Sequence, residues 1–183
     1  MAPKDGASPW MEAGREAGLV LSAQQGDRKA YMELAEHYTA TLHRLAYALT
    51  RNADDAHDVT RETLIYGWKN IKHLPVGRPF CPWLMRATRN VSISMRRRRA
   101  GGSDAAPGSP GVRTTARERV FLGAFGDLTP DEQVVLVMRL VERFAYQDIA
   151  TALEVPTRTA MSRVATAREH LRARIAERAR KAA

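Results

Sequence analysis

The 183-residue sequence predicts an all-α fold of two small helical domains joined by a flexible linker, the second domain being a helix-turn-helix. In both halves, apolar residues recur at steps of three and four, which is the spacing of an amphipathic helix. Neither half contains the alternation of apolar and polar residues that is typical of a strand. Between the halves, residues 100–116 are rich in Gly, Pro, Ser and Ala and lack the apolar side chains that a core requires.

The chain is expected to begin with a flexible tail, residues 1–16, followed by the first domain, residues 17–99. The first long helix of that domain should begin after Asp27, because an aspartate is a favourable N-cap. Its buried stripe would run from Tyr31 to Leu49, with apolar side chains every three or four residues.

Two further helices complete the first domain. The one from about Asp55 to Ile71 follows Asn52 and Asp54 as caps and starts with a cluster of aspartates, where the helix dipole favours carboxylates. Two prolines and a glycine make residues 74–79 a loop. The next helix has Pro82 in its first turn and becomes steadily more basic, ending in four consecutive arginines at 96–99.

The second domain, residues 117–176, should begin with a short helix. The segment Thr129-Pro130-Asp131-Glu132 is then a capping box that starts another. A short helix at 146–153, a three-residue turn at 154–156 and a long helix from Thr157 follow. This arrangement, with arginines on the last helix, is that of a helix-turn-helix.

The charge of the chain favours a polyanionic partner. Lys and Arg number 29 against 20 Asp and Glu, for a net charge of +9. Nine arginines and only two acidic residues lie between Arg86 and Arg119. Such a balance suits nucleic acid or an anionic membrane surface, although a solubilising surface is the plain alternative. Residues 177–183 are expected to form a frayed basic tail.

A cytoplasmic location is expected from three features. Cys81 is the single cysteine, so no intrachain disulfide can form. No apolar run approaches the ~18 residues of a membrane span, so no membrane insertion is expected. The first sixteen residues also lack the apolar core of a signal peptide.

Together these motifs resemble a bacterial RNA polymerase sigma factor of the sigma-70 family, of the extracytoplasmic-function (ECF) type. The resemblance covers about Leu19 to Ile175. The segment Asp55-Ala-His-Asp-Val-Thr-Arg-Glu-Thr63 resembles region 2, and Trp83-Leu-x-Arg-Ala-x-Arg-Asn90 resembles the helix that follows it. The segments at 128–132, 146–150 and 156–171 resemble region 4.

The resemblance implies three functional surfaces, and it implies core RNA polymerase (β′ clamp and β flap), promoter DNA and an anti-sigma factor as partners. The residues implied in polymerase binding are Asp55, Asp58, Arg61, Glu62 and Thr63. Those implied at the minus-ten element are Arg78, Trp83, Arg86, Arg89, Asn90, Arg96 and Arg97, with core packing as the alternative for Trp83. Those implied at the minus-35 element are Arg158, Thr159, Ser162, Arg163 and Thr166.

Some positions depart from the family pattern. Arg61 stands where the family usually has glutamine, and Glu154 stands where a glycine is common in the turn. In the recognition helix, positions that are often basic or histidine in the family are Met161, Ala165 and Thr166. The changes at Arg61 and in the recognition helix motivate a second hypothesis, a sigma-like mimic that occupies an anti-sigma factor. A third is a freestanding helix-turn-helix regulator, which would usually need two-fold symmetry to read paired half-sites.

An enzyme is not expected, and neither a catalytic residue, a metal nor a cofactor is predicted. The five histidines do not pair at a helical metal-ligand spacing with a flanking glutamate, and no glycine-rich phosphate loop is present. Cys81 has no recognisable base partner, so a small buried thiol is the better interpretation.

Overall fold

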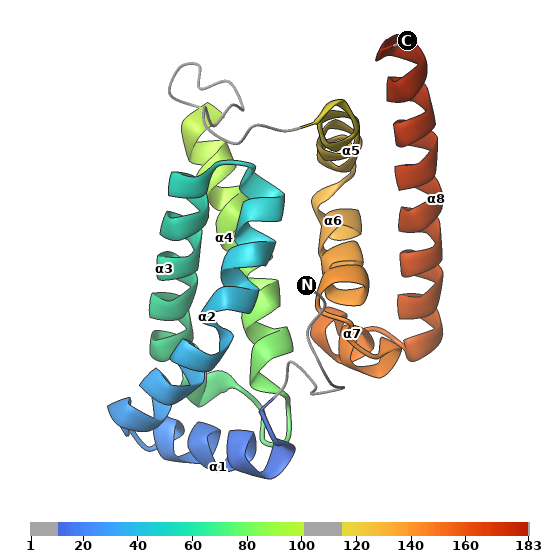
Figure 1. The fold of residues 1–183 in the computed structure, drawn as a ribbon. Coiled ribbons are helices and arrows are strands. Elements are labelled where there is room, and N and C mark those ends of the chain that lie inside the picture. Colours follow the sequence, from blue (N-terminus) through green and yellow to red (C-terminus); the bar gives the residue numbers. More distant parts are fainter. Residues whose placement is uncertain (1–10, 101–114, 183) are drawn as a thin grey trace.

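The computed structural model describes residues 11–100 and 115–182, which form two helical lobes (Figure 1). Every regular element in these ranges is a helix, as predicted. The expected tail residues 1–10 and most of the expected linker, residues 101–114, lie outside the described ranges.

The first lobe contains four α-helices and one short 3-10 turn. They are α1 (Ala13–Gln24), α2 (Arg28–Thr50), α3 (Ala53–Asn70), η1 (Ile71–His73) and α4 (Phe80–Ala100). The caps Asp27 and Asn52 are confirmed, because the Asp27 side chain accepts from the backbone N–H of Lys29 at 2.8 Å and Asn52 accepts from Asp55 at 3.1 Å. Asp54, also predicted as a cap, lies inside the first turn of α3 instead.

Helices α2, α3 and α4 pack against one another around a glycine. A Cβ atom at Gly67 of α3 would lie 2.4 Å from the Tyr31 hydroxyl of α2 and 2.8 Å from Cδ2 of Leu84 of α4. No real side chain fits at such distances, so the absence of one lets the three helices approach. The expected stripes are buried here, including Leu34, Leu42 and Val59, all at 0% exposure.

The predicted flexible tail is wrong for residues 11–16. Met11 is buried, α1 already begins at Ala13, and the Glu16 side chain is 7% exposed. The carboxylate of Glu16 accepts a hydrogen bond from the Tyr38 hydroxyl and another, of 2.7 Å, from the backbone N–H of Phe80. It thereby satisfies a donor at the start of α4, which a sequence pattern local to α1 could not reveal.

The second lobe contains four α-helices and one π-helical segment. They are α5 (Ala116–Gly126), α6 (Pro130–Leu136), η2 (Val137–Val141), α7 (Tyr146–Leu153) and α8 (Thr157–Ala182). The predicted capping box is confirmed, since Thr129 and Glu132 satisfy each other's backbone N–H groups. A second box joins Thr115 and Glu118 at the start of α5.

The π-helical segment changes which side chains are buried. Val134 and Met138 are at most 1% exposed, whereas Val141, three residues after Met138, is 54% exposed. A π-helical turn closes i to i+5 bonds, so it rotates the following residues away from the stripe that an α-helix would continue.

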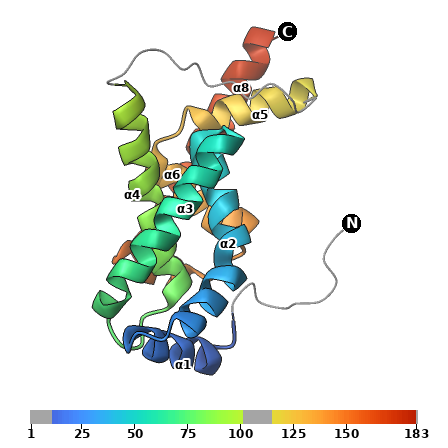
Figure 2. The same cartoon turned by 90° about the vertical axis from the view of Figure 1, so that its left-hand side faces the viewer.

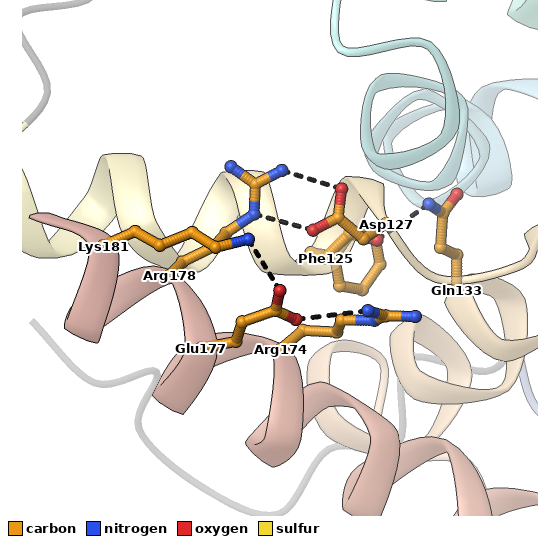
Figure 3. Close-up of polar contacts among 7 residues, drawn as sticks. All are labelled: Phe125, Asp127, Gln133, Arg174, Glu177, Arg178 and Lys181. Carbon is orange, nitrogen blue, oxygen red and sulfur yellow. Dashed lines mark hydrogen bonds and ion pairs between the residues drawn. The ribbon is translucent and has the colours of Figure 1, made fainter.

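The expected frayed tail after residue 176 is also wrong, because α8 continues to Ala182. The guanidinium of Arg178 donates two hydrogen bonds of 2.7 Å to the Asp127 carboxylate at the end of α5 (Figure 3). Glu177 pairs with Lys181 at 2.7 Å and with Arg174 at 3.3 Å along α8. The bond between Arg178 and Asp127 lowers the pKa of Asp127 and ties the last turns of α8 to α5.

The two lobes pack directly on each other, which the sequence did not predict. Helices α6 and α7 lie beside α2 and α4 (Figures 1 and 2). One continuous group of buried apolar side chains includes Leu42 and Leu84 of the first lobe and Val134 and Ile149 of the second. The lobes therefore share a core in this arrangement.

Replacing Glu16 by alanine should destabilise the first lobe by about 1–3 kcal/mol, because the Tyr38 hydroxyl and the Phe80 N–H would lose a buried acceptor. Chemical denaturation of the variant measures this change. Glu36→Ala, at an exposed position of α2, is the matched control and should change stability by less than about 0.5 kcal/mol. Equal effects of the two substitutions would contradict the proposed anchoring by Glu16.

Candidate nucleic-acid interface

The exposed face of α3 carries the acidic cluster. Asp54 and Arg61 are exposed and Asp58 is half-buried, and Arg61 pairs with Asp58 at 3.3 Å. Glu62 pairs with Arg98 of α4 at 3.0 Å. Asp55 lies partly buried in the first turn, where the helix dipole stabilises its charge. This face offers mixed charges to a partner, with its carboxylates gathered toward the start of the helix.

Thr63 does not belong to this face, and its prediction as a polymerase contact is wrong. Its side chain is 0% exposed. Val59, Thr63 and Gly67 are spaced four residues apart, and all three lie on the buried side of α3.

Three of the residues predicted at the minus-ten element lie together on α4, and two of them contact the second lobe. Arg86 pairs with Glu154 at 2.6 Å, and Arg89 pairs with Asp131. Arg89 also donates to the Asn90 side-chain oxygen at 3.0 Å. The face of α4 predicted to meet DNA therefore holds carboxylates of α6 and of the α7–α8 turn.

The arginines at the end of α4 differ in role. Arg96 donates a 2.8 Å hydrogen bond to the backbone carbonyl of Leu49, which belongs to the last turn of α2. This contact satisfies one of the carbonyls that a helix end leaves without an intrahelical partner. Arg97 is exposed and Arg98 is engaged with Glu62. Arg96 and Arg97, the two residues predicted here, are both exposed, and Arg96 also contacts α2.

The loop before α4 lies beside the same arginines. Arg78 is exposed and lines, with Trp83, Arg86 and Glu154, a cavity of about 60 Å³ between the lobes. The indole of Trp83 lies 6.0 Å from the ring of Phe80 and 6.0 Å from that of Tyr66. Trp83 is half-buried, since it packs against the core and also lines this cavity.

The helix-turn-helix is formed by α7, the turn at 154–156 and α8. Glu154 adopts the left-handed conformation with φ of 54°, at the position where the family commonly has glycine. A non-glycine residue in this conformation costs roughly 1–2 kcal/mol. The turn is closed by a 3.0 Å hydrogen bond from the Val155 N–H to the Ala150 carbonyl.

The first half of α8 presents the residues predicted at the minus-35 element. Arg158, Ser162, Arg163 and Thr166 are exposed, and Thr159 is half-buried. On the opposite side, Ala160, Val164 and Ala167 are at most 1% exposed and pack into the second lobe. The residues predicted at this surface therefore share one accessible side of α8.

Acidic residues lie next to this surface. Asp131 and Glu132 of α6 line a hollow of about 340 Å³ together with Ser162, Arg163 and Thr166. Burial favours the neutral acid, but hydrogen bonds from Thr129 and His170 outweigh it and lower the pKa of Glu132. Glu132 is therefore ionised at neutral pH.

Sequence reasoning missed the contacts between the lobes. The Glu142 side chain is 2% exposed and accepts from Arg44 at 2.6 and 2.8 Å and from Thr41 at 3.2 Å. Arg51 of the first lobe lies against the second, because a Cβ at Gly126 would be 2.3 Å from its guanidinium. The partners in the first contact are 98 residues apart, so no local spacing could have identified them.

The structure brings His43 and His57 together with ring centres 4.5 Å apart, although the sequence indicated no histidine pair. Burial and the neighbouring His57 lower the pKa of His43. Among the described residues, His, Cys, Asp and Glu side chains form no group of three that could hold a metal ion. Within the same ranges, no helix is long and apolar enough to cross a membrane.

Comparison with known proteins agrees with this geometry. Residues 34–101 match the family model Sigma-70 region 2, and residues 119–171 match Sigma-70, region 4. The chain is 30% identical to the ECF RNA polymerase sigma factor SigE of Mycolicibacterium smegmatis, over 90% of this chain and 70% of that relative. It is also 30% identical to SigL of Mycobacterium tuberculosis, over 86% of this chain and 96% of SigL.

Two solved structures share the fold. One is CnrH in complex with the cytosolic domain of CnrY, with a TM-score of 0.66 and 20% identity over 87% of this chain and 96% of that one. The other is the sigma factor RpoE of Bartonella quintana in complex with the anti-sigma factor NepR, with a TM-score of 0.63 and 22% identity over 80% of this chain and 97% of that one.

The thiol of Cys81 should react with a disulfide reagent only when the protein unfolds. Cys81 is 1% exposed, so a reagent cannot reach its sulfur. Burial also raises the pKa of the thiol, so little of the reactive thiolate is present. Kinetics of thiol labelling in native buffer and in denaturant measure this. A Met32→Cys substitution in a Cys81→Ser protein is the control and should react at once, since Met32 is 68% exposed. Rapid labelling of native Cys81 would contradict its burial.

Proposed function

Because the chain belongs to the ECF sigma factors of the sigma-70 family, we propose that its three surfaces perform the successive steps of promoter recognition. Helix α3 would bind core RNA polymerase, α4 the minus-ten element and α8 the minus-35 element. In this proposal the protein acts by binding alone and performs no bond chemistry, and its place of action is the cytoplasm, where the polymerase works.

The observation that carries the proposal is the order of the parts along one chain. An acidic helix start precedes a helix rich in arginine, and a helix-turn-helix follows in a separate lobe. The two family regions match in the same order, at 34–101 and 119–171. We propose 17–99 and 117–176 as the two functional domains, with the first extended to include α1 and the second extended to the end of α8.

At the minus-ten element, the proposed role of α4 is to hold a separated strand. Unstacking bases costs a few kcal/mol per step, so binding energy has to offset it. Arg86, Arg89 and Arg97 would supply phosphate contacts, which are strong but independent of sequence. Asn90, an exposed amide beside Arg89, has the donors and acceptors to read a base edge.

At the minus-35 element, α8 would enter the major groove with its first turns. Recognition helices of this motif contact base edges through their N-terminal residues. Arg158 and Arg163 offer guanidinium groups, and Ser162 and Thr166 offer hydroxyl groups, from one accessible side of the helix. The proposed division of labour is phosphate contact by some of these groups and base contact by others.

The proposed protein partners are the β′ clamp and β flap of core polymerase and an anti-sigma factor. The anti-sigma partner is supported by the fold shared with the Bartonella quintana RpoE–NepR complex. The mimic hypothesis rests on Arg61, which takes Asp58 into an intrahelical pair where the family usually has a neutral glutamine. That pair would weaken the polymerase grip and leave the protein to occupy an anti-sigma factor.

The test is transcription in vitro from a genomic promoter library, with core polymerase and purified variants. The combined Arg89→Ala and Asn90→Ala protein should lose promoter opening by about 10-fold or more, since charge-assisted hydrogen bonds contribute roughly 1.5–3 kcal/mol each. Its binding to core polymerase on a sizing column should be unchanged. Asp58→Ala should have the opposite effect, because its main consequence should be weaker binding to core polymerase. If neither the variants nor the parent protein raises transcription above the level of core polymerase alone, the mimic hypothesis is favoured.

A second substitution tests α8. Arg163→Ala should weaken binding to a promoter found in that library by about 1–3 kcal/mol and relax its sequence preference if Arg163 contacts a base. Arg172→Ala, exposed two turns further along α8, is the matched control and should leave the preference unchanged. Binding isotherms on wild-type and mismatched duplexes measure both. Equal losses for the two variants would show that α8 supplies charge only.

A further inference from the structure

We propose that helix α1 sets the base preference at the minus-ten element, because two of its side chains fix both ends of the loop at residues 74–79. Gln24 holds the start of this loop and Glu16 holds its end. The inference rests on the proposed function, which places the loop and α4 at the minus-ten element. It adds a positioning role for a helix that precedes the residues matched to Sigma-70 region 2 and carries none of those predicted to touch DNA.

The start of the loop is held by one amide group. The side-chain nitrogen of Gln24 donates to the backbone carbonyl of Ile71 at 3.0 Å and to that of Leu74 at 2.8 Å. A primary amide has two N–H donors, so this one side chain can serve both carbonyls at once. Both carbonyls lie around the end of a helical segment, where backbone acceptors are left over for side chains. Gln24 therefore fixes the direction in which the chain leaves η1.

The end of the loop is held by a carboxylate of the same helix. Glu16 accepts a 2.7 Å hydrogen bond from the backbone N–H of Phe80, the first residue of α4. Glu16 and Gln24 are about two helical turns apart, and Val20 and Ala23 between them are buried. Helix α1 crosses the end of the first lobe where the chain passes from α3 to α4 (Figures 1 and 2). Both anchors therefore belong to one rigid element.

The loop between these anchors is stiff. Pro75 and Pro79 restrict their own φ angles, and Gly77 has a φ of 78°, which glycine adopts without strain. The backbone N–H of Arg78 closes a turn by donating to the Pro75 carbonyl at 3.1 Å. A stiff segment moves as a unit when one end is released. Loss of an anchor would therefore displace the side chain of Arg78 and not only the residue beside the anchor.

The anchored loop forms one wall of the cavity beside α4. Residues of the first lobe that line this cavity of about 60 Å³ include Leu74, Pro75, Arg78 and Pro79 on the loop and Trp83 and Arg86 on α4. Leu74, whose carbonyl Gln24 holds, thus belongs to the wall itself. A DNA strand whose phosphate is bound by Arg86 would bring a base to this wall. Which base fits there depends on where α1 holds the loop.

The first test replaces Gln24 by leucine, which keeps much of the side-chain volume but removes both donors. Amide exchange of the segment 74–80 in the full-length protein should become about 3- to 10-fold faster, because two hydrogen bonds are lost, while α8 stays unchanged. Gln25→Leu, the same change at the exposed neighbouring position, is the matched control and should exchange like the parent. Unchanged exchange in Gln24→Leu would overturn the inference. Melting curves check that every variant is folded.

The second test measures base preference by transcription with core polymerase, from a promoter found in the genomic library and then randomised at its minus-ten element. Gln24→Leu should lower the preference for the best base by about 3- to 10-fold at one or two minus-ten positions. The minus-35 preference and polymerase binding should not change. A side chain with only a structural role would lower all yields in proportion. Faster exchange with an unaltered minus-ten preference would therefore overturn the inference.

Arg78→Ala separates this inference from the proposed function. Arg78 lies on the loop itself and is predicted at the minus-ten element, so its loss should alter the preference at the same positions. If Arg78→Ala alters the preference and Gln24→Leu does not, only the positioning role of α1 is lost. If neither variant alters it, or if the parent protein starts no transcripts, the proposed role of the first lobe at the minus-ten element fails together with the inference.

Discussion

The buried carboxylate of Glu142 is the constraint on which the closed arrangement depends. Removing a charged group from water is costly unless partners replace the lost hydration, and Arg44 and Thr41 of the first lobe supply them. In the orientation that the structure shows, the Glu142 carboxylate lies against Arg44 and Thr41. In that orientation α6 and the α7–α8 turn lie beside α4, which brings Asp131 and Glu154 to Arg89 and Arg86.

A buried ion pair fixes geometry more reliably than it adds stability. When the lobes separate, water hydrates the Glu142 carboxylate again. This hydration offsets much of the electrostatic attraction to Arg44 that is lost. The cost of opening is set mainly by the apolar side chains shared between the lobes, such as Leu42 and Val134. Closure is thus specific in its polar contacts, and the shared apolar side chains supply most of its free energy.

Local patterns in the sequence predicted the helices well, because caps and apolar spacing act within a few residues. Asp27, Asn52 and the Thr129–Glu132 box begin helices as expected. The errors came from contacts between distant residues. Glu16 orders the start of the chain through Phe80, and Arg178 continues α8 by pairing with Asp127. Thr63 is a different case, because its four-residue spacing from Val59 and Gly67 places it on the buried side of α3. No spacing rule reports the pairs between distant residues, and the contacts between lobes belong to the same class.

The most direct measurement reports the separation of the two lobes. It is fluorescence energy transfer between dyes attached at Val76→Cys and Glu169→Cys in a Cys81→Ser protein. Val76 is exposed in the loop before α4, and Glu169 is exposed on α8 beyond the predicted minus-35 residues. The account predicts high transfer in the free protein and a marked fall when core polymerase and promoter DNA are added. Transfer that is equally low in the free protein, or that stays high in a transcribing complex, would contradict it.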